Sequence, residues 1–179
     1  YTPCMSGPSS TPTVARVFLD CEFTGFVDPQ LLSLALVLSD TESFYGELHI
    51  PTESREINQF VDEHVLTQWG RVPTAYPTSN GMAQALSSWL LWLNADKVEV
   101  HYDYHADMDL LEELLKKADL WETWEKTLVP THVGYLSGDD RVEPFMKRCW
   151  DIEEVRTGLK PQHALADARV LRKACRMVH

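Results

Sequence analysis

Residues 14–25 read VARVFLDCEFTG, an apolar run that ends in two carboxylates, Asp20 and Glu22, on either side of Cys21. The run is rich in β-branched and aromatic side chains, which predicts a buried strand over 14–21. Side chains alternate along a strand, so Asp20 and Glu22 share one face and Cys21 takes the other. Crowded carboxylates repel each other unless a cation lies between them, and Mg²⁺ or Mn²⁺ suits such hard oxygen ligands. The alternative is an acidic pair at a strand end with no metal.

A third acid follows in the segment 97–117, where a short alternating strand (97–102) runs through a turn into a predicted helix (106–117). Asp107 lies three and four residues before the first leucines of the helix, so it falls on their apolar stripe and needs a partner. We therefore choose Asp107 over Asp103, which lies in the turn, and over Asp109, which points away from the stripe. The alternative is that Asp107 only caps the helix. The stripe consists of Leu110, Leu111, Leu114 and Leu115.

The last segment of this kind is Pro161 followed by QHALADARVL, which predicts a closing helix over 163–176. His163 and Asp167 lie four residues apart and so share a helical face. Histidine is the side chain most easily used as a general base near neutral pH. The alternative is a surface histidine with an acidic partner one turn later.

Taken together, these motifs resemble the DEDDh 3′–5′ exonucleases, and the resemblance spans residues 15–175. Within that family the chain is most similar to ribonuclease T, oligoribonuclease and a mycobacterial adenylate-preferring exoribonuclease. The resemblance implies a ribonuclease H-like α/β fold with a mixed five-stranded sheet flanked by helices. It also implies phosphodiester hydrolysis at a site that holds two Mg²⁺ or Mn²⁺ ions. By position, the metal-binding acids are Asp20, Glu22, Asp107 and Asp167, and the general base is His163.

The histidine departs from the family pattern by one residue. The family motif His-x-Ala-x-x-Asp places the histidine five positions before the aspartate, and here that slot holds Gln162. His163 lies four positions before Asp167, at a loop-to-helix junction where the backbone can absorb a shift. We expect His163 to be the base, and the alternative is that Gln162 orients the attacking water in its place.

The expected partner is the 3′ end of single-stranded RNA. Phe23 and Phe26 lie beside the first acids and can stack on a terminal base, and Thr24 and Gly25 complete the predicted substrate-binding set. The net charge of −11 argues against tight coating of long duplexes, although residues 141–179 are basic. Three alternatives remain open: a DNA-directed proofreading-type exonuclease, a metal-dependent phosphatase or nucleotidase, and a binding module with impaired catalysis. A homodimer also remains open.

Composition predicts one compact domain over 14–179 after a flexible lead at 1–13, because 179 residues can bury a substantial core. No apolar run approaches the ~20 residues of a membrane span, so no membrane partner is expected. The four cysteines show no paired spacing, which favours reduced thiols in a cytoplasmic protein.

The remaining elements are predicted from periodicity and turn residues. Strands at 31–39 and 43–50 should form an antiparallel meander with the first strand. Helices are expected at 56–68 and 80–94, and a loop near the site at 70–81. A fifth strand is expected near 145–151.

Overall fold

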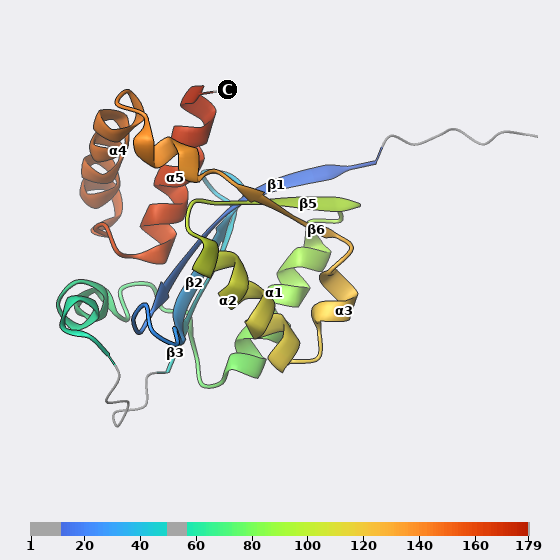
Figure 1. Cartoon of the computed structure of the whole chain (residues 1–179). Helices are drawn as coiled ribbons and strands as arrows, with labels where there is room; N and C mark the ends of the chain where they lie inside the picture. The colour runs from blue at the N-terminus through green and yellow to red at the C-terminus, as the bar shows by residue number, and fades with distance from the viewer. Residues whose placement is uncertain (1–11, 50–56, 179) are drawn as a thin grey trace, which may run out of the picture.

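A single mixed sheet forms the centre of the molecule (Figure 1), in a computed structural model that describes residues 12–49 and 57–178. The strand order across the sheet is β4-β3-β2-β1-β5-β6. The first three strands form an antiparallel meander, whereas β5 and β6 run parallel to β1, and β4 runs parallel to β3. The strands are β1 (Val14–Phe23), β2 (Leu31–Val37), β3 (Ser43–Leu48), β4 (Ala75–Tyr76), β5 (Lys97–Tyr102) and β6 (Leu128–His132).

Helices cover both faces of this sheet, with α1, α2 and α3 on one face and α4 and α5 on the other (Figure 1). Val17, Leu19 and Cys21 of β1 enter the core beneath α1 and α2, whereas Phe18 packs with the α5 side. The alternation predicted for the first strand is therefore confirmed. The helices are α1 (Ser79–Trp92), α2 (His105–Lys117), α3 (Trp121–Trp124), α4 (Val142–Thr157) and α5 (Ala164–Val178).

The parallel pair β1 and β5 determines where functional side chains can gather. Phe18 pairs with His101 across these strands, so the two strands end at the same edge of the sheet. The carboxyl ends of parallel neighbours meet there, and Asp20 and Asp103 each follow two residues after the last pair. This edge is where ligands bind in open α/β sheets.

The predicted strand near 145–151 is wrong, because those residues lie within α4. Val142, Cys149 and Glu153 are buried at helical spacing, as one face of a helix that packs against its neighbours requires. The fifth strand is instead β6, which sequence analysis missed. It is a short edge strand with exposed residues and contains Pro130, a residue tolerated mainly at sheet edges.

The region between β3 and α1 is less regular than predicted. The described part of the expected helix at 56–68 contains a π-helical turn, η1 (Val61–Val65), and a 3₁₀ turn, η2 (Leu66–Gln68). The expected loop at 70–81 contains β4 and ends where α1 begins, with the Thr78 side chain accepting a hydrogen bond from the Gly81 backbone N–H. A further 3₁₀ turn, η3 (Gly134–Gly138), precedes α4.

The predicted flexible lead lies outside the described residues from 1 to 11. Thr13, its last residue, is anchored, because its backbone N–H donates to the Asp96 carboxylate over 2.7 Å. The described cysteines, Cys21, Cys149 and Cys175, are unpaired and buried. Among the described residues, no helix is long and apolar enough to cross a membrane.

Candidate active site

The two acids of the first motif lie at the end of β1 on the face covered by α5. Asp20 pairs with Ala35 and Glu22 pairs with Ser33 on β2, so small side chains lie beside both carboxylates. A register shift between Glu22 and Phe23 ends the regular ladder directly after the acids. The structure therefore brings Asp20 and Glu22 to one face, as the two-residue spacing predicted.

Asp107 lies in the first turn of α2 and is only 2% exposed. Its Oδ1 accepts a hydrogen bond from the Cys21 backbone N–H over 3.2 Å, which ties α2 to the end of β1. Its Oδ2 is buried and has no hydrogen-bond partner among the described residues. Asp107 is not the N-cap residue of α2, because Tyr104 occupies that position. A buried carboxylate oxygen with no donor requires a proton or a cation.

Asp167 approaches from the first turn of α5 and is oriented by two donors. Trp150 Nε1–H donates to its Oδ1 over 2.7 Å, and the Gln162 backbone N–H donates to its Oδ2 over 2.9 Å. Sequence reasoning missed Trp150, because α4 was interpreted as a strand. The signal that would have found it is the helical spacing of buried residues in α4.

These acids form two groups that share one member. Carboxylate oxygens of Asp20, Glu22 and Asp167 lie within 4.8 Å of one another. A second group, with the same spacing, combines Asp20 and Asp107 with Asp103, which sequence analysis had set aside. Each group can supply three oxygen ligands to a metal ion.

Burial and the proximity of the acids to one another disfavour their ionised forms. Burial raises the pKa of Asp20 well above its usual range, and the neighbouring charges of Asp167 and Asp107 raise it further. Burial also raises the pKa of Glu22 and of Asp107. The pKa of Asp167 rises to about 7 through burial, although its hydrogen bonds from Trp150 and Gln162 act against the rise. Bound cations would relieve this repulsion.

Asp20, Asp103 and Asp167 line a cavity of about 380 Å³ between the sheet edge, α4 and α5. Apolar side chains of Leu136, Met146 and Leu171 line part of it. Its volume lies within the range of about 300–1,000 Å³ typical of small-molecule sites. The polar residues that line it are Asp20, Asp103, Glu143, Trp150, Gln162 and Asp167.

His163 is not among the described residues that line this cavity. Its imidazole is 3% exposed and stacks on Tyr45, with Nε2 at 3.3 Å from the Tyr45 hydroxyl. That hydroxyl donates to the buried carboxylate of Glu47 over 2.7 Å. Burial lowers the pKa of His163 to about 4, so the ring is neutral at pH 7. Among the described residues, no hydrogen bond joins the His163 imidazole to these acids, although the Asp167 backbone N–H donates to the His163 carbonyl oxygen over 3.0 Å. The role of His163 as general base stays a prediction.

Gln162 occupies the position at the cavity instead. Its backbone adopts a φ of +63°, a left-handed conformation that is uncommon for a residue with a side chain. This conformation lets its N–H reach Asp167 across five residues. The strain therefore serves to hold a metal-binding candidate in place.

An aromatic patch lies next to the acids and consists of Phe23, Phe26 and Tyr104. Phe23 stacks on Tyr104 at a centroid distance of 6.1 Å, and Phe26 meets both rings edge-on. Phe26 is 76% exposed and Tyr104 is 48% exposed, so two of the rings are available to a ligand. Sequence analysis anticipated Phe23 and Phe26 but not Tyr104.

Thr24 and Gly25 contribute to the shape of the turn beside this patch. Thr24 is buried, and its side-chain oxygen accepts a hydrogen bond from the Gln30 backbone N–H over 3.1 Å, which closes the β1–β2 turn. A Cβ at Gly25 would lie 3.2 Å from the side-chain nitrogen of Asn58. Contact of either residue with a substrate stays a prediction.

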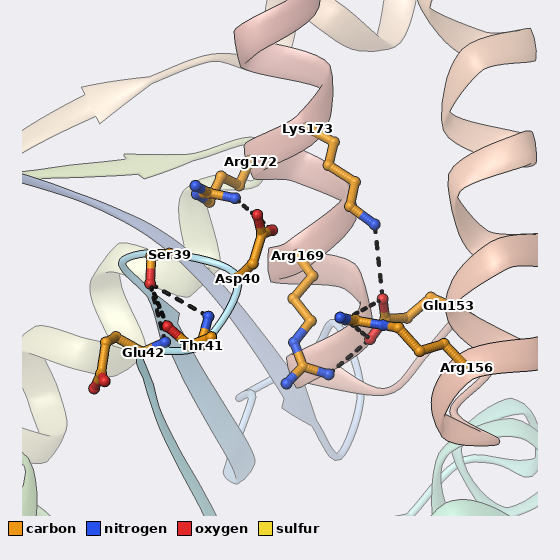
Figure 2. Close-up of polar contacts among 9 residues, drawn as sticks. All are labelled: Ser39, Asp40, Thr41, Glu42, Glu153, Arg156, Arg169, Arg172 and Lys173. Carbon is orange, nitrogen blue, oxygen red and sulfur yellow. Dashed lines mark hydrogen bonds and ion pairs between the residues drawn. The ribbon is translucent and has the colours of Figure 1, made fainter.

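The basic residues of α5 are used mainly in packing (Figure 2). Arg169 pairs with the fully buried Glu153 of α4 at 2.6 Å, and Lys173 lies 3.8 Å from the same carboxylate. Arg172 pairs with Asp40 in the β2–β3 turn at 2.8 Å. These cations therefore hold α5 against α4 and the sheet and do not form a free surface for phosphates.

Comparison with known proteins gives a structural match. No protein-family model matches this chain, and no curated protein matches it. The chain is similar to the crystal structure of cell-death related nuclease 4 (CRN-4), with a TM-score of 0.51 and 13% sequence identity. The match covers 93% of this chain, which spans 64% of the length of that neighbour.

The fold is ribonuclease H-like. The expected fold class, a mixed sheet flanked by helices, is thus confirmed. The sheet has six strands and not five: β1, β2, β3 and β5 were expected, whereas β6 and the short β4 were not.

Proposed function

We propose that the chain is a metal-dependent 3′–5′ exoribonuclease that hydrolyses single-stranded RNA from its 3′ end to 5′ mononucleotides. The observation that carries the proposal is the sharing of Asp20 between two groups of three carboxylates at the edge of the sheet. Such sharing is what a site for two closely spaced ions requires. The name of the structural neighbour CRN-4 and the resemblance to DEDDh exonucleases both favour a nuclease.

The residues present fit two divalent ions, Mg²⁺ or Mn²⁺. Buried Oδ2 atoms of Asp20 and Asp107 have no hydrogen-bond partner among the described residues, and burial, with neighbouring carboxylates, raises the pKa of both acids. Asp20, Glu22, Asp107 and Asp167 would hold the ions, which when bound stabilise negative charge on a scissile phosphate and its leaving oxygen.

Other residues of the chain position these ligands and the substrate. Trp150 and the Gln162 backbone fix the orientation of Asp167, and Cys21 fixes that of Asp107. The remaining requirement is a group that accepts a proton from the attacking water. His163 can do so only if its ring turns from Tyr45 toward the cavity, whereas the Gln162 amide can orient water but cannot accept its proton at neutral pH.

A single-stranded end is the substrate that fits the surroundings of the acids. The aromatic patch offers exposed rings for base stacking, which contributes about 1–3 kcal/mol per base. The cavity of about 380 Å³ has the size of a small-molecule site and suits one chain terminus. The net charge of −11 disfavours long phosphate-covered duplexes. The preference for RNA over DNA rests on the resemblance to exoribonucleases.

The placement of His163 favours a second candidate, a nucleic-acid-binding module with impaired catalysis. His163 is 3% exposed and its ring contacts Tyr45, so among the described residues no histidine lines the cavity. Such a module would bind a single-stranded end through metal and stacking contacts and would turn over slowly.

Polarity and product identity test the proposal. Single-stranded RNA labelled at either end is incubated with Mg²⁺ or Mn²⁺, alongside circular RNA and DNA of the same sequence. We expect the 3′ label to leave first as a mononucleotide, the 5′ label to remain on a shortening ladder, and circular RNA to stay intact. Cleavage of the circle would falsify the exonuclease assignment, and faster loss of the DNA would favour the proofreading-type alternative.

A further inference from the structure

Asp103 lies where the parallel strands β1 and β5 end together. Phe18 and His101 are the last paired residues of these strands, and Asp20 and Asp103 each follow two positions later. Carboxylate oxygens of Asp103, Asp20 and Asp107 approach within 4.8 Å of one another. Asp103 also lines the cavity that holds Asp20 and Asp167. A fifth acid therefore belongs to the candidate site.

A second observation points to a ligand for this group. Asp107 is 2% exposed, and its Oδ1 already accepts the Cys21 N–H. Its Oδ2 is buried and lacks a hydrogen-bond partner among the described residues. A buried carboxylate oxygen beside two further carboxylates is satisfied by a cation that all three coordinate.

The backbone of Asp103 is held in place by segments far away in the sequence. His132 Nε2–H, at the end of β6, donates to the Asp103 carbonyl oxygen over 3.1 Å, and the His132 ring stacks on His105 at 4.1 Å. Gly134 permits this arrangement, because a Cβ there would lie 2.5 Å from the His132 ring. Asp103 is thus positioned before any ligand binds, as precise metal sites require.

We propose that Asp103 is the third carboxylate ligand of one divalent ion, together with Asp20 and Asp107, so that the chain binds two divalent ions before nucleic acid arrives. The inference rests on the proposed function, because it uses the same acids as metal ligands. Sites with one or two carboxylates usually need substrate phosphates to complete the coordination of Mg²⁺. A third carboxylate removes that need for this ion.

The test is calorimetric titration of the metal-free chain with Mn²⁺ in the absence of nucleic acid. We expect two ions per wild-type chain, and Asp103→Asn should weaken one of the two sites by more than about tenfold while the other is retained. Asp109→Asn is the matched control, because Asp109 is an exposed acid of α2 that belongs to neither group. Asp20→Asn, which removes the shared ligand, should weaken both sites.

The outcomes separate this inference from the proposed function. Two unchanged sites in Asp103→Asn, or a single site in the wild type, overturn the role of Asp103 and leave the proposed function standing. No binding by the wild type at millimolar Mn²⁺ overturns both. Thermal melts without metal confirm folding, and Asp103→Asn should melt no lower than wild type because it removes one of several crowded charges. Asp103→Ser, with the same expectation for Mn²⁺, replaces Asp103→Asn if that variant does not fold.

Discussion

Trp150 donates its indole N–H to Oδ1 of Asp167 over 2.7 Å and so connects α4 with the acid at the start of α5. Together with the Gln162 backbone N–H, it leaves the carboxylate one orientation toward the cavity. The hydrogen bond also opposes the rise in the pKa of Asp167 that burial causes. Trp150 thus favours the ionised form that a metal needs.

We expect Trp150→Phe to weaken Mn²⁺ binding by about tenfold, the lower end of what loss of a hydrogen bond to a ligand costs. Phenylalanine retains most of the apolar packing and removes the N–H. Calorimetry measures the change, and Trp92→Phe is the control because Trp92 is 59% exposed on α1. Equal affinities in the two variants would mean that Trp150 serves packing alone.

Removal of one acid should stabilise the metal-free protein. Asp20 has a raised pKa because of burial and the charges of Asp167 and Asp107, so its ionised form destabilises the fold. Asp20→Asn should therefore raise the melting temperature at pH 8, by about 2–4 °C per kcal/mol of repulsion removed. Mn²⁺ should then stabilise the wild type and not the variant.

The pH dependence of that difference has a defined sign. The pKa values of these carboxyl groups are higher in the folded than in the unfolded chain, so their protonated forms stabilise the fold at low pH. This stability is lost as the pH rises through the folded-state pKa, which is about 7 for Asp167. The advantage of Asp20→Asn over wild type should consequently grow between pH 5 and pH 8 without metal. A constant or shrinking difference in melting temperature would contradict the electrostatic account.

Turnover of two variants can decide whether His163 or Gln162 acts on the attacking water. If His163 turns into the site as base, His163→Ala should lower turnover by about 10² to 10⁴ with Mn²⁺ binding nearly unchanged. Gln162→Ala should then cost no more than about tenfold, because an amide does not accept a proton. In the position against Tyr45, burial lowers the pKa of His163 to about 4, so the ring stays neutral and able to accept a proton down to about pH 5.

The reverse ranking, with Gln162→Ala crippling and His163→Ala mild, would assign water orientation to Gln162 and favour the binding module. Since His163 is buried, melting temperatures must accompany both rate measurements. Turnover is compared at temperatures well below each melt, so that a loss of folding is not mistaken for a loss of catalysis.

The ion pairs between α4 and α5 provide a stability prediction with a neighbouring control. Glu153 has no exposed surface and accepts from Arg169 and Arg156 at 2.6 Å and 2.8 Å (Figure 2). Glu153→Ala should destabilise the fold by about 3 kcal/mol, because it leaves partly buried cations without their partner. Glu154→Ala, one residue later and exposed, should change stability by about 0.5 kcal/mol or less. Urea unfolding measures both, and equal effects would refute a structural role for the cluster.

Local periodicity predicted much of the site. The two-residue spacing of Asp20 and Glu22 and the apolar stripe that contains Asp107 depend only on one strand and one helix, and the structure places all three as expected. The three-stranded meander was predicted for the same reason, since turn residues separate its strands. These features need no knowledge of distant contacts.

Features that depend on distant contacts could not be predicted. Asp103 joins the acids only because β5 lies parallel to β1, a pairing between residues 83 positions apart that no local pattern records. The His163 ring contacts Tyr45, which in turn donates to Glu47 on β3. The residues next to His163 in the sequence do not indicate these contacts. For α4, the prediction of a strand at 145–151 overlooked a local signal, because Phe145 and Met146 lie four positions before Cys149 and Trp150, which is helical spacing.

Turnover of 3′-labelled single-stranded RNA by the wild type and by Asp20→Asn, each with Mn²⁺ and with EDTA, tests the central claim most directly. The account predicts release of labelled mononucleotide by the wild type with Mn²⁺, none with EDTA, and a loss of at least about 10³ in Asp20→Asn, which belongs to both acid groups. Release that persists in EDTA, or an Asp20→Asn variant as active as wild type, would contradict it.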